Sequence, residues 1–312
     1  MSSYTMDRRT SRQQRAFPAG VGTSWRPGRT GLIRAFRLLG LAGAALFLVG
    51  SQAMANVITV DEIAPAVFPG NFGTLSQFNV GPNSTTDPGV NQYCAPTATM
   101  NSFTFLQNKY PSVYGLDKNG NPILEGGQGS WLAAAQLLAG PNYMNTNQNT
   151  GTTDTNWVAG KVNYLNAFAP GKTTFAGMDS AATNPRPAWD QNANPTVNFM
   201  LQQLRAGEDI EIGISAPGHV LTLTGLTWND ANNDGVFDAG DTLTLNTIDP
   251  ANPGANTALT LTPGNPMTIS GGAYNGLVVD AALAESPVPE PATIVLFLIG
   301  GLALLARRRT AA

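Results

Sequence analysis

The stretch that decides the fold is Asp209-Ile-Glu-Ile-Gly-Ile-Ser215, followed two residues later by Gly218-His-Val-Leu-Thr-Leu-Thr-Gly225. Isoleucine occupies every second position of the first segment, and leucine does so in the second as far as Leu223. Alternation with a period of two predicts strands that bury one face. The same criterion predicts further strands at 242–248, 258–261 and 277–279.

Upstream of these strands the chain has helical signals. Helices are predicted at 94–109, at 131–138 after the N-cap Ser130, and at 196–206 before Gly207. Residues 56–92 suggest a loop-like lead with one or two short strands, and residues 141–195 give only weak signals. Helices first and antiparallel strands second predict an α+β fold of one domain, with N-terminal helices packed on a C-terminal antiparallel sheet.

The N-terminus carries a predicted secretion signal. Eight arginines precede an apolar run from Leu38 to Val49, and the run ends in Ala53-Met54-Ala55. A basic region, a short apolar core and an A-x-A site are typical of a signal peptide, so residues 1–55 are assigned to it and signal peptidase is expected to cut after Ala55. An uncleaved anchor is the alternative, and the true start could be Met6 or later.

The C-terminus is built from three parts in order. Val288-Pro289-Glu290-Pro291 precedes a charge-free run from Ile294 to Ala306, and three arginines follow. This arrangement resembles the PEP-CTERM sorting signal of Gram-negative bacteria. The resemblance implies processing by exosortase, transient anchoring in the inner membrane by a short transmembrane helix at 287–312, and association with exopolysaccharide-producing envelopes. A plain membrane anchor is the alternative.

Residues 56–286 remain as the working domain, long enough for a good core. They carry six basic against eighteen acidic residues, a net charge of −12. Such a surface excludes nucleic acid and anionic lipid as expected partners and suits contact with divalent cations. The chain has one cysteine, so no internal disulfide can form.

The single cysteine and the single histidine both stand where a nucleophile and its base are wanted. Cys94 opens a predicted helix, where unpaired N–H groups and the macrodipole lower a thiol pKa. His219 opens a strand, and Asp249 closes a later one in Ile248-Asp249-Pro250. The three could meet at one sheet edge as nucleophile, base and orienter. Taken alone, a lone cysteine or histidine is more often structural.

Gln92-Tyr-Cys94-Ala-Pro-Thr-Ala98 resembles the nucleophile motif of the C39-like peptidases, relatives of the bacteriocin-leader peptidases within the papain-like superfamily. The His219 block and Asp249-Pro250 resemble the other two blocks, over roughly residues 92–250. The resemblance implies a papain-like fold, with Cys94 as nucleophile, His219 as general base and acid, and Asp249 as orienter. Ala95 replaces the usual glycine, and the oxyanion glutamine is left open between Gln92, which is placed in the catalytic set, and Gln77.

A run of twelve residues between the His219 and Asp249 strands fits the EF-hand loop template. Gly235 holds the sixth position, where the template needs a sharp turn. The predicted ligands of one structural Ca²⁺ are Asp230, Asn232, Asp234, the Val236 carbonyl, Asp238 and Asp241. Aspartate in place of glutamate at the last position predicts modest affinity, and an ion-free polar turn is the alternative.

Together these features predict an exported, envelope-associated cysteine peptidase that hydrolyses peptide or isopeptide bonds through a Cys-His-Asp triad. Its expected partners are signal peptidase, exosortase and a peptide or protein substrate. Its expected location is the cell-envelope surface or extracellular matrix. The alternative is an inactive matrix, adhesion or peptide-binding protein of the extracellular polysaccharide layer.

Overall fold

The protein's structure is a computed structural model that describes residues 55–61, 72–81, 92–180, 185–215 and 218–288. All of these belong to the compact unit Ser51–Ala312. Most of the predicted signal peptide and the apolar part of the predicted sorting tail lie outside the described residues. Within the described parts, no helix has both the length and the apolar character that crossing a membrane requires.

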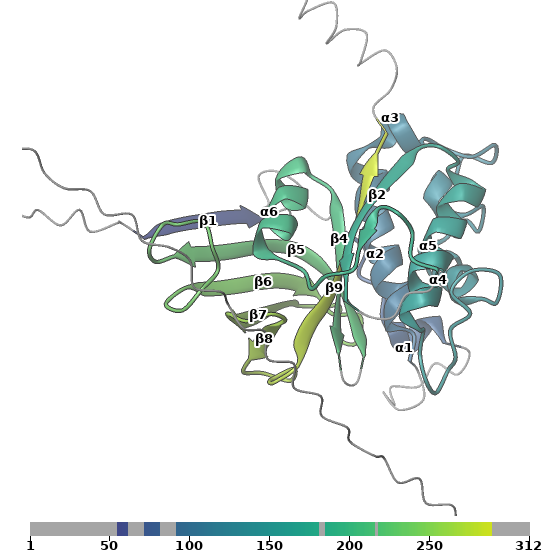
Figure 1. The fold of residues 1–312 in the computed structure, drawn as a ribbon. Coiled ribbons are helices and arrows are strands. Elements are labelled where there is room, and N and C mark those ends of the chain that lie inside the picture. The colour runs from purple at the N-terminus through teal and green to yellow at the C-terminus, as the bar shows by residue number, and fades with distance from the viewer. Residues whose placement is uncertain (1–54, 62–71, 82–91, 181–184, 216–217, 289–312) are drawn as a thin grey trace, which may run out of the picture. The chain divides into compact units, whose positions relative to one another are not determined.

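The helices gather mainly before the middle of the chain (Figure 1). Their bounds are α1 Gln77–Val80, α2 Cys94–Lys109, α3 Pro111–Tyr114, the 3-10 helix η1 Ile123–Glu125, α4 Trp131–Ala139, α5 Asp154–Phe168 and α6 Val197–Ala206. Polar caps explain where three of them start, since the Ser130, Thr153 and Thr196 hydroxyls each accept a backbone N–H three residues ahead. The predicted helices at 94–109, 131–138 and 196–206 are confirmed to within a residue at each end.

Nine strands in the described residues form one sheet. They are β1 Asn56–Asp61, β2 Thr173–Asp179, β3 Asp190–Gln191, β4 Asp209–Ser215, β5 His219–Asp230, β6 Thr242–Ile248, β7 Asn256–Thr262, β8 Met267–Ser270 and β9 Val278–Pro287. Strands β4 to β9 pair in succession, and β9 also pairs with β4. The six strands therefore close into a ring, which leaves β1 beside β5 and β2 beside β9 as extensions.

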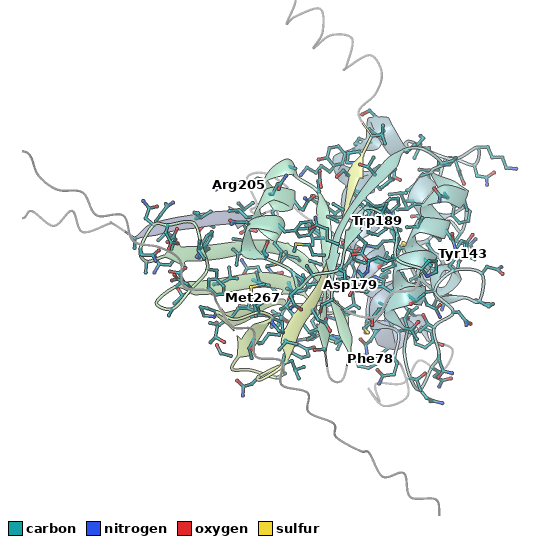
Figure 2. All side chains as sticks on the ribbon, viewed as in Figure 1. Phe78, Tyr143, Asp179, Trp189, Arg205 and Met267 are labelled. Carbon is teal, nitrogen blue, oxygen red and sulfur yellow. The ribbon has the colours of Figure 1, made fainter. Side chains whose placement is uncertain are left out.

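Each face of the central strands has its own core. Ala281 and Leu283 of β9 pack with α2, α4 and α5, whereas Ala282 and Ala284 pack with α6 and the inner faces of the ring strands. This follows from the two-residue period of a strand, which points successive side chains to opposite faces. Side chains fill both regions in Figure 2, where Arg205 marks the exposed side of α6.

Helix α2 is buried on nearly every side. It packs against β4 and β5 on one side and contacts α4 and α5 on the other. Two side-chain hydrogen bonds fix its position: Thr222 Oγ1 of β5 donates to the Ala98 carbonyl at 2.9 Å, and Trp157 Nε1 of α5 donates to Thr99 Oγ1 at 3.3 Å. The residue that opens α2, Cys94, is thereby held against the start of β5.

The predicted fold class, a papain-like α+β fold with N-terminal helices on a C-terminal antiparallel sheet, is wrong. The sheet draws strands from the whole domain: β1 precedes every helix, and β2 and β3 lie between α5 and α6. The sheet is also mixed, because β2 and β3 pair in parallel while the other pairs are antiparallel. One or two short strands were expected within 56–92, where β1 lies, but the weak sequence signals of 141–195 did not reveal β2 and β3.

Candidate active site

Cys94 is the first residue of α2 and is buried, with 6% of its surface exposed. Its helix begins without a side-chain cap, since Tyr93 at the N-cap makes no such hydrogen bond. The first N–H groups of the helix are therefore available to the sulfur, and the Ala95 N–H bonds to it. The Val220 N–H of β5 adds a second backbone hydrogen bond to the same sulfur.

The other two predicted triad members meet at this point. His219 opens β5 and hydrogen-bonds to Cys94. Its Nε2 lies 2.9 Å from Asp249 Oδ1, and because a carboxylate only accepts, Nε2–H is the donor. This leaves Nδ1 to face the Cys94 sulfur. The structure thus brings the three predicted residues into one hydrogen-bonded chain.

Asp249 is itself held from two further sides. The Ala251 N–H donates to Oδ1 at 2.8 Å, in the turn that follows β6. The Tyr274 hydroxyl donates to Oδ2 at 2.5 Å, and the Tyr274 ring stacks on the His219 ring with centroids 5.5 Å apart. The carboxylate and the imidazole are therefore fixed in both position and orientation.

These contacts set the charge state of the site. Burial alone would raise the pKa of the Cys94 thiol. The hydrogen bond and the charge of His219, together with the backbone hydrogen bonds of Val220 and Ala95, bring this pKa below its ordinary value. Burial likewise opposes the charged imidazole, yet Asp249 and Cys94 raise the pKa of His219 to about 10. A thiolate beside an imidazolium is the form that this arrangement favours at neutral pH.

A cavity of about 280 Å³ opens beside the sulfur. Gln92, one of the two candidate oxyanion donors, lines it together with Cys94 and His219. Gln77, the other candidate, is buried elsewhere: its backbone N–H bonds to the Pro250 carbonyl at 2.9 Å, just beyond Asp249. Of the two glutamines, only Gln92 lies in the wall of the cavity.

The predicted calcium loop joins β5 to β6 and folds on its own carboxylates. Asp230 Oδ2 accepts the Gly235 N–H at 2.9 Å, and Asp234 Oδ1 accepts the Val236 N–H at 2.8 Å. Asp241 is buried, and its two oxygens accept from the Ala231 N–H at 2.8 Å and from the Trp228 indole at 3.1 Å. Among the described residues, no three of the loop carboxylates lie within 4.8 Å of one another.

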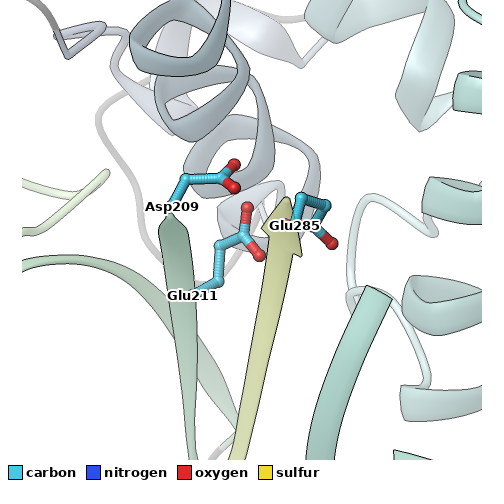
Figure 3. A group of neighbouring side chains, drawn as sticks. All are labelled: Asp209, Glu211 and Glu285. Atoms are coloured by element: carbon cyan, nitrogen blue, oxygen red, sulfur yellow. The ribbon is translucent and has the colours of Figure 1, made fainter. Parts of the chain in front are cut away.

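A different group of three carboxylates among the described residues does lie this close together. Asp209 and Glu211 of β4 and Glu285 of β9 are buried and lie beside one another, with one carboxylate oxygen of each within 4.8 Å of the other two (Figure 3). Lys161 of α5, which is fully buried, forms ion pairs with Glu211 and, at 2.6 Å, with Glu285. Lys161 thus places one ammonium among the three carboxylates, and its two ion pairs form an ionic tie between α5 and the sheet.

Neither Tyr274 nor this ionic cluster was predicted from the sequence. Tyr274 lies in the turn between β8 and β9, in Gly271-Gly-Ala-Tyr274-Asn-Gly276, where the glycines indicate only a turn. No sequence signal links that turn to Asp249, because the contact depends on closure of the ring by β8 and β9. The buried lysine and glutamates could have been noticed only as charges inside otherwise apolar elements.

Residues 287–309 match the PEP-CTERM protein-sorting motif, as the sequence analysis expected. The motif indicates an exported, exosortase-processed protein located at the cell envelope or outside the cell. A comparison with curated proteins finds no match to the chain.

Proposed function

We propose that this protein is an exported cysteine hydrolase that cleaves peptide or isopeptide bonds. The observation that carries the proposal is the hydrogen-bonded chain from Cys94 through His219 to Asp249, which opens on a cavity. A cysteine that is only structural has no need of a partner imidazole, an oriented carboxylate and two N–H donors. The sequence resemblance around residues 92–98 and 219–250 points to the same chemistry.

The chemistry follows from the positions of the groups. The Cys94 thiolate adds to the scissile carbonyl carbon, and the carbonyl oxygen takes the negative charge. The imidazolium of His219 donates its Nδ1 proton to the leaving amine, which departs as the thioester forms. Neutral His219 then takes a proton from water, whose oxygen attacks the thioester and releases the acid and the thiolate. Asp249 keeps Nε2–H oriented throughout.

Gln92 is the proposed oxyanion donor. Gln92 lines the same cavity as Cys94, and a side-chain amide can donate an N–H to a developing oxyanion. Gln77, buried against the segment after Asp249, is proposed as a structural residue. Gln92→Ala is therefore expected to reduce turnover, and Gln77→Ala to reduce stability instead.

The pH dependence of cysteine alkylation tests the proposal without knowledge of the substrate. Cys94 is the only cysteine of the chain, so every alkylated molecule reports on it. An ordinary thiol of pKa about 8.5 is only about 0.3% thiolate at pH 6. The ion pair predicts that Cys94 reacts rapidly with iodoacetamide at pH 6 and that the rate rises little between pH 6 and pH 8. The mass of the intact protein measures the extent of alkylation at each time.

His219→Ala is the matched variant in this experiment. It should restore an ordinary profile in which the rate rises about tenfold per pH unit up to the normal thiol range. An ordinary profile in the unaltered protein would contradict the proposal. That result would leave the alternative reading, an inactive binding or matrix protein of the envelope.

We also propose that the β5–β6 loop binds one structural Ca²⁺ through Asp230, Asn232, Asp234, Val236, Asp238 and Asp241. Support comes from the positions of these residues along the sequence, which fit the EF-hand loop template, and from positive φ at Asn233 and Gly235, which lets the loop turn back on its own carboxylates. The loop is at the opposite end of the long strand β5 from His219, roughly 35 Å away for twelve extended residues. The ion is therefore proposed to stabilise the domain, with little direct effect on the chemistry.

Calcium removal should lower the melting temperature of the mature domain. A ligand that binds only the folded state at a hundredfold excess over Kd adds about 2.7 kcal/mol, which corresponds to several degrees for a domain of this size. Asp234→Ala should melt lower and lose its response to EDTA. Asp117→Ala is the control, because Asp117 caps a similar exposed turn outside the loop. Identical melts with calcium and with EDTA would rule out the ion.

A further inference from the structure

Two carboxylates share the cavity with Cys94. Asp154, the first residue of α5, is exposed at its rim, and Asp280 of β9 is half-buried in its wall. None of the described residues that line the cavity is a lysine or an arginine. The charges of His219 and the Cys94 thiolate offset each other, and Asp249 behind His219 is also negative, so the two aspartates add to a net negative charge at the site.

Asp280 is built into the site by its neighbours. A Cβ added at Gly213 would lie 3.3 Å from Asp280 Oδ1 and 3.3 Å from the Trp157 ring, so the absence of a side chain there lets both approach strand β4. Asp280 also hydrogen-bonds to the Ser215 side chain. Burial and the nearby Asp154 raise the pKa of Asp280, which is the mark of a carboxylate that lacks a close cation.

The net negative charge of the whole domain also favours a cationic substrate. Residues 56–286 carry a net charge of −12, from six basic and eighteen acidic residues. A concave site of low dielectric concentrates the field of such charges and raises the local concentration of cations. An anionic substrate would face repulsion both on approach and inside the cavity.

We propose that the Cys94 cavity selects a substrate with a positively charged group beside the scissile carbonyl, held by Asp280 and Asp154. The group is an ammonium or a guanidinium, from a lysine or arginine side chain or from a free α-amine. This inference rests on the proposed function, since it names the substrate class of the same site. Asp280, in the cavity wall, is the proposed specificity residue, and Asp154 strengthens the field at the rim.

Charged methanethiosulfonates of similar size measure this selection directly. The Cys94 thiolate attacks the reagent's sulfenyl sulfur, a mixed disulfide forms and methanesulfinate leaves. The rates of the trimethylammonium-ethyl and sulfonatoethyl reagents are compared, each divided by the rate of the neutral methyl reagent with the same protein. At low ionic strength the cationic reagent should react at least about tenfold faster, and the ratio should shrink in 0.5 M salt.

Asp280→Asn and Asp154→Asn should each lower this ratio several-fold, and the double variant should leave only the small preference that the charge of the rest of the domain supplies. Asp117→Asn is the matched control, because it removes one negative charge from an exposed turn that does not line the cavity. To separate the two sources of cation, peptidyl acyloxymethyl ketones carry either lysine with a blocked N-terminus or norleucine with a free α-amine. A blocked norleucine peptide is the neutral reference.

The outcomes separate failure of this inference from failure of the proposed function. Fast reaction of Cys94 with the neutral reagent at pH 6, but with a charge ratio near one, would overturn the selection while leaving the nucleophile intact. Slow reaction at pH 6 with every reagent would overturn the proposed function. A ratio above ten that survives the double variant would show that the field of the whole domain, and not these aspartates, selects the cation.

Discussion

Cys94→Ala is expected to abolish hydrolysis of peptides by this protein, and His219→Ala is expected to slow it by at least about a thousandfold. The cysteine supplies the only nucleophile in the proposed step. Without His219, Cys94 loses both the partner that lowers its pKa and the proton that the leaving amine requires. The two losses are not additive, because the residues act as a unit.

Activity can be measured with a mixed library of synthetic peptides, in which new N-termini are identified by mass spectrometry. Asp249→Asn should be milder, at about ten- to a hundredfold, since Asp249 orients the imidazole and stabilises its charge. Tyr274→Phe should cost only a few-fold, because the phenyl ring can keep its stacking on His219 while the hydroxyl that donates to Asp249 is lost. Thermal melts of all four variants verify that they fold.

Full activity in a folded His219→Ala protein would remove the cysteine mechanism. Equal losses in the Asp249 and Tyr274 variants would instead indicate that the hydroxyl contributes as much to orientation as the carboxylate. The four variants therefore test which residues belong to the hydrogen-bonded series and how much each contributes to activity.

The candidate triad could be found from sequence because its members are rare and lie at element boundaries. The chain has one cysteine and one histidine, and strong helix and strand signals place each at the start of an element. Two such starts meet only if the helix packs on the strand, which the buried face of α2 ensures. The distances between the three residues and their charge states could be obtained only from the folded structure.

Helix α5 could not be predicted for a physical reason. Two residues on its buried side are not apolar, which breaks the helical period on which sequence analysis depends. A Cβ at Gly160 would lie 2.6 Å from the Met144 nitrogen, so glycine allows close packing there, and Lys161 is buried with carboxylates. The part of the cavity wall that α5 supplies, which includes Asp154 and Trp157, was missed with it.

Strand β9 was predicted at only a fraction of its length for a related reason. Its residues from Ala281 to Glu285 are buried on both faces, so the alternation that marks a half-buried strand is absent. The alanines in this part of β9 also have a high helix propensity, which argues against a strand. With β9 shortened and β8 missed, neither the closed ring nor the approach of Tyr274 to Asp249 could be foreseen.

Lys161→Met is expected to lower the stability of the domain by about 3–5 kcal/mol, the usual cost of breaking a buried ion pair. The substitution keeps most of the side-chain volume but leaves Glu211, Glu285 and Asp209 without the ammonium between α5 and the sheet. For a domain of this size the melting temperature should fall by roughly 10 °C. Lys118→Met is the matched control, since Lys118 is exposed.

The loss of stability in Lys161→Met should depend on pH, because the neighbouring Glu285 titrates. Burial and the charge of Glu211 raise the pKa of Glu285 well above its usual range, although Lys161 opposes the shift. The folded state therefore binds more protons than the unfolded state once the pH exceeds the unfolded carboxyl's value of 4.5, so this group's contribution to stability falls as pH rises. Removing the ammonium should steepen that fall, and the deficit of Lys161→Met should be larger at pH 8 than at pH 5.

Glu285→Gln provides the complementary measurement, because the amide has a similar shape and cannot ionise. Its stability curve should be flatter than that of the unaltered protein between pH 5 and pH 8, while Lys161 keeps Glu211 as its partner. Chemical denaturation of the three proteins at both pH values gives the comparison. If Lys161→Met loses the same stability at pH 5 and pH 8, the carboxylates do not titrate against the ammonium, and the tie from α5 to β4 and β9 depends on packing alone.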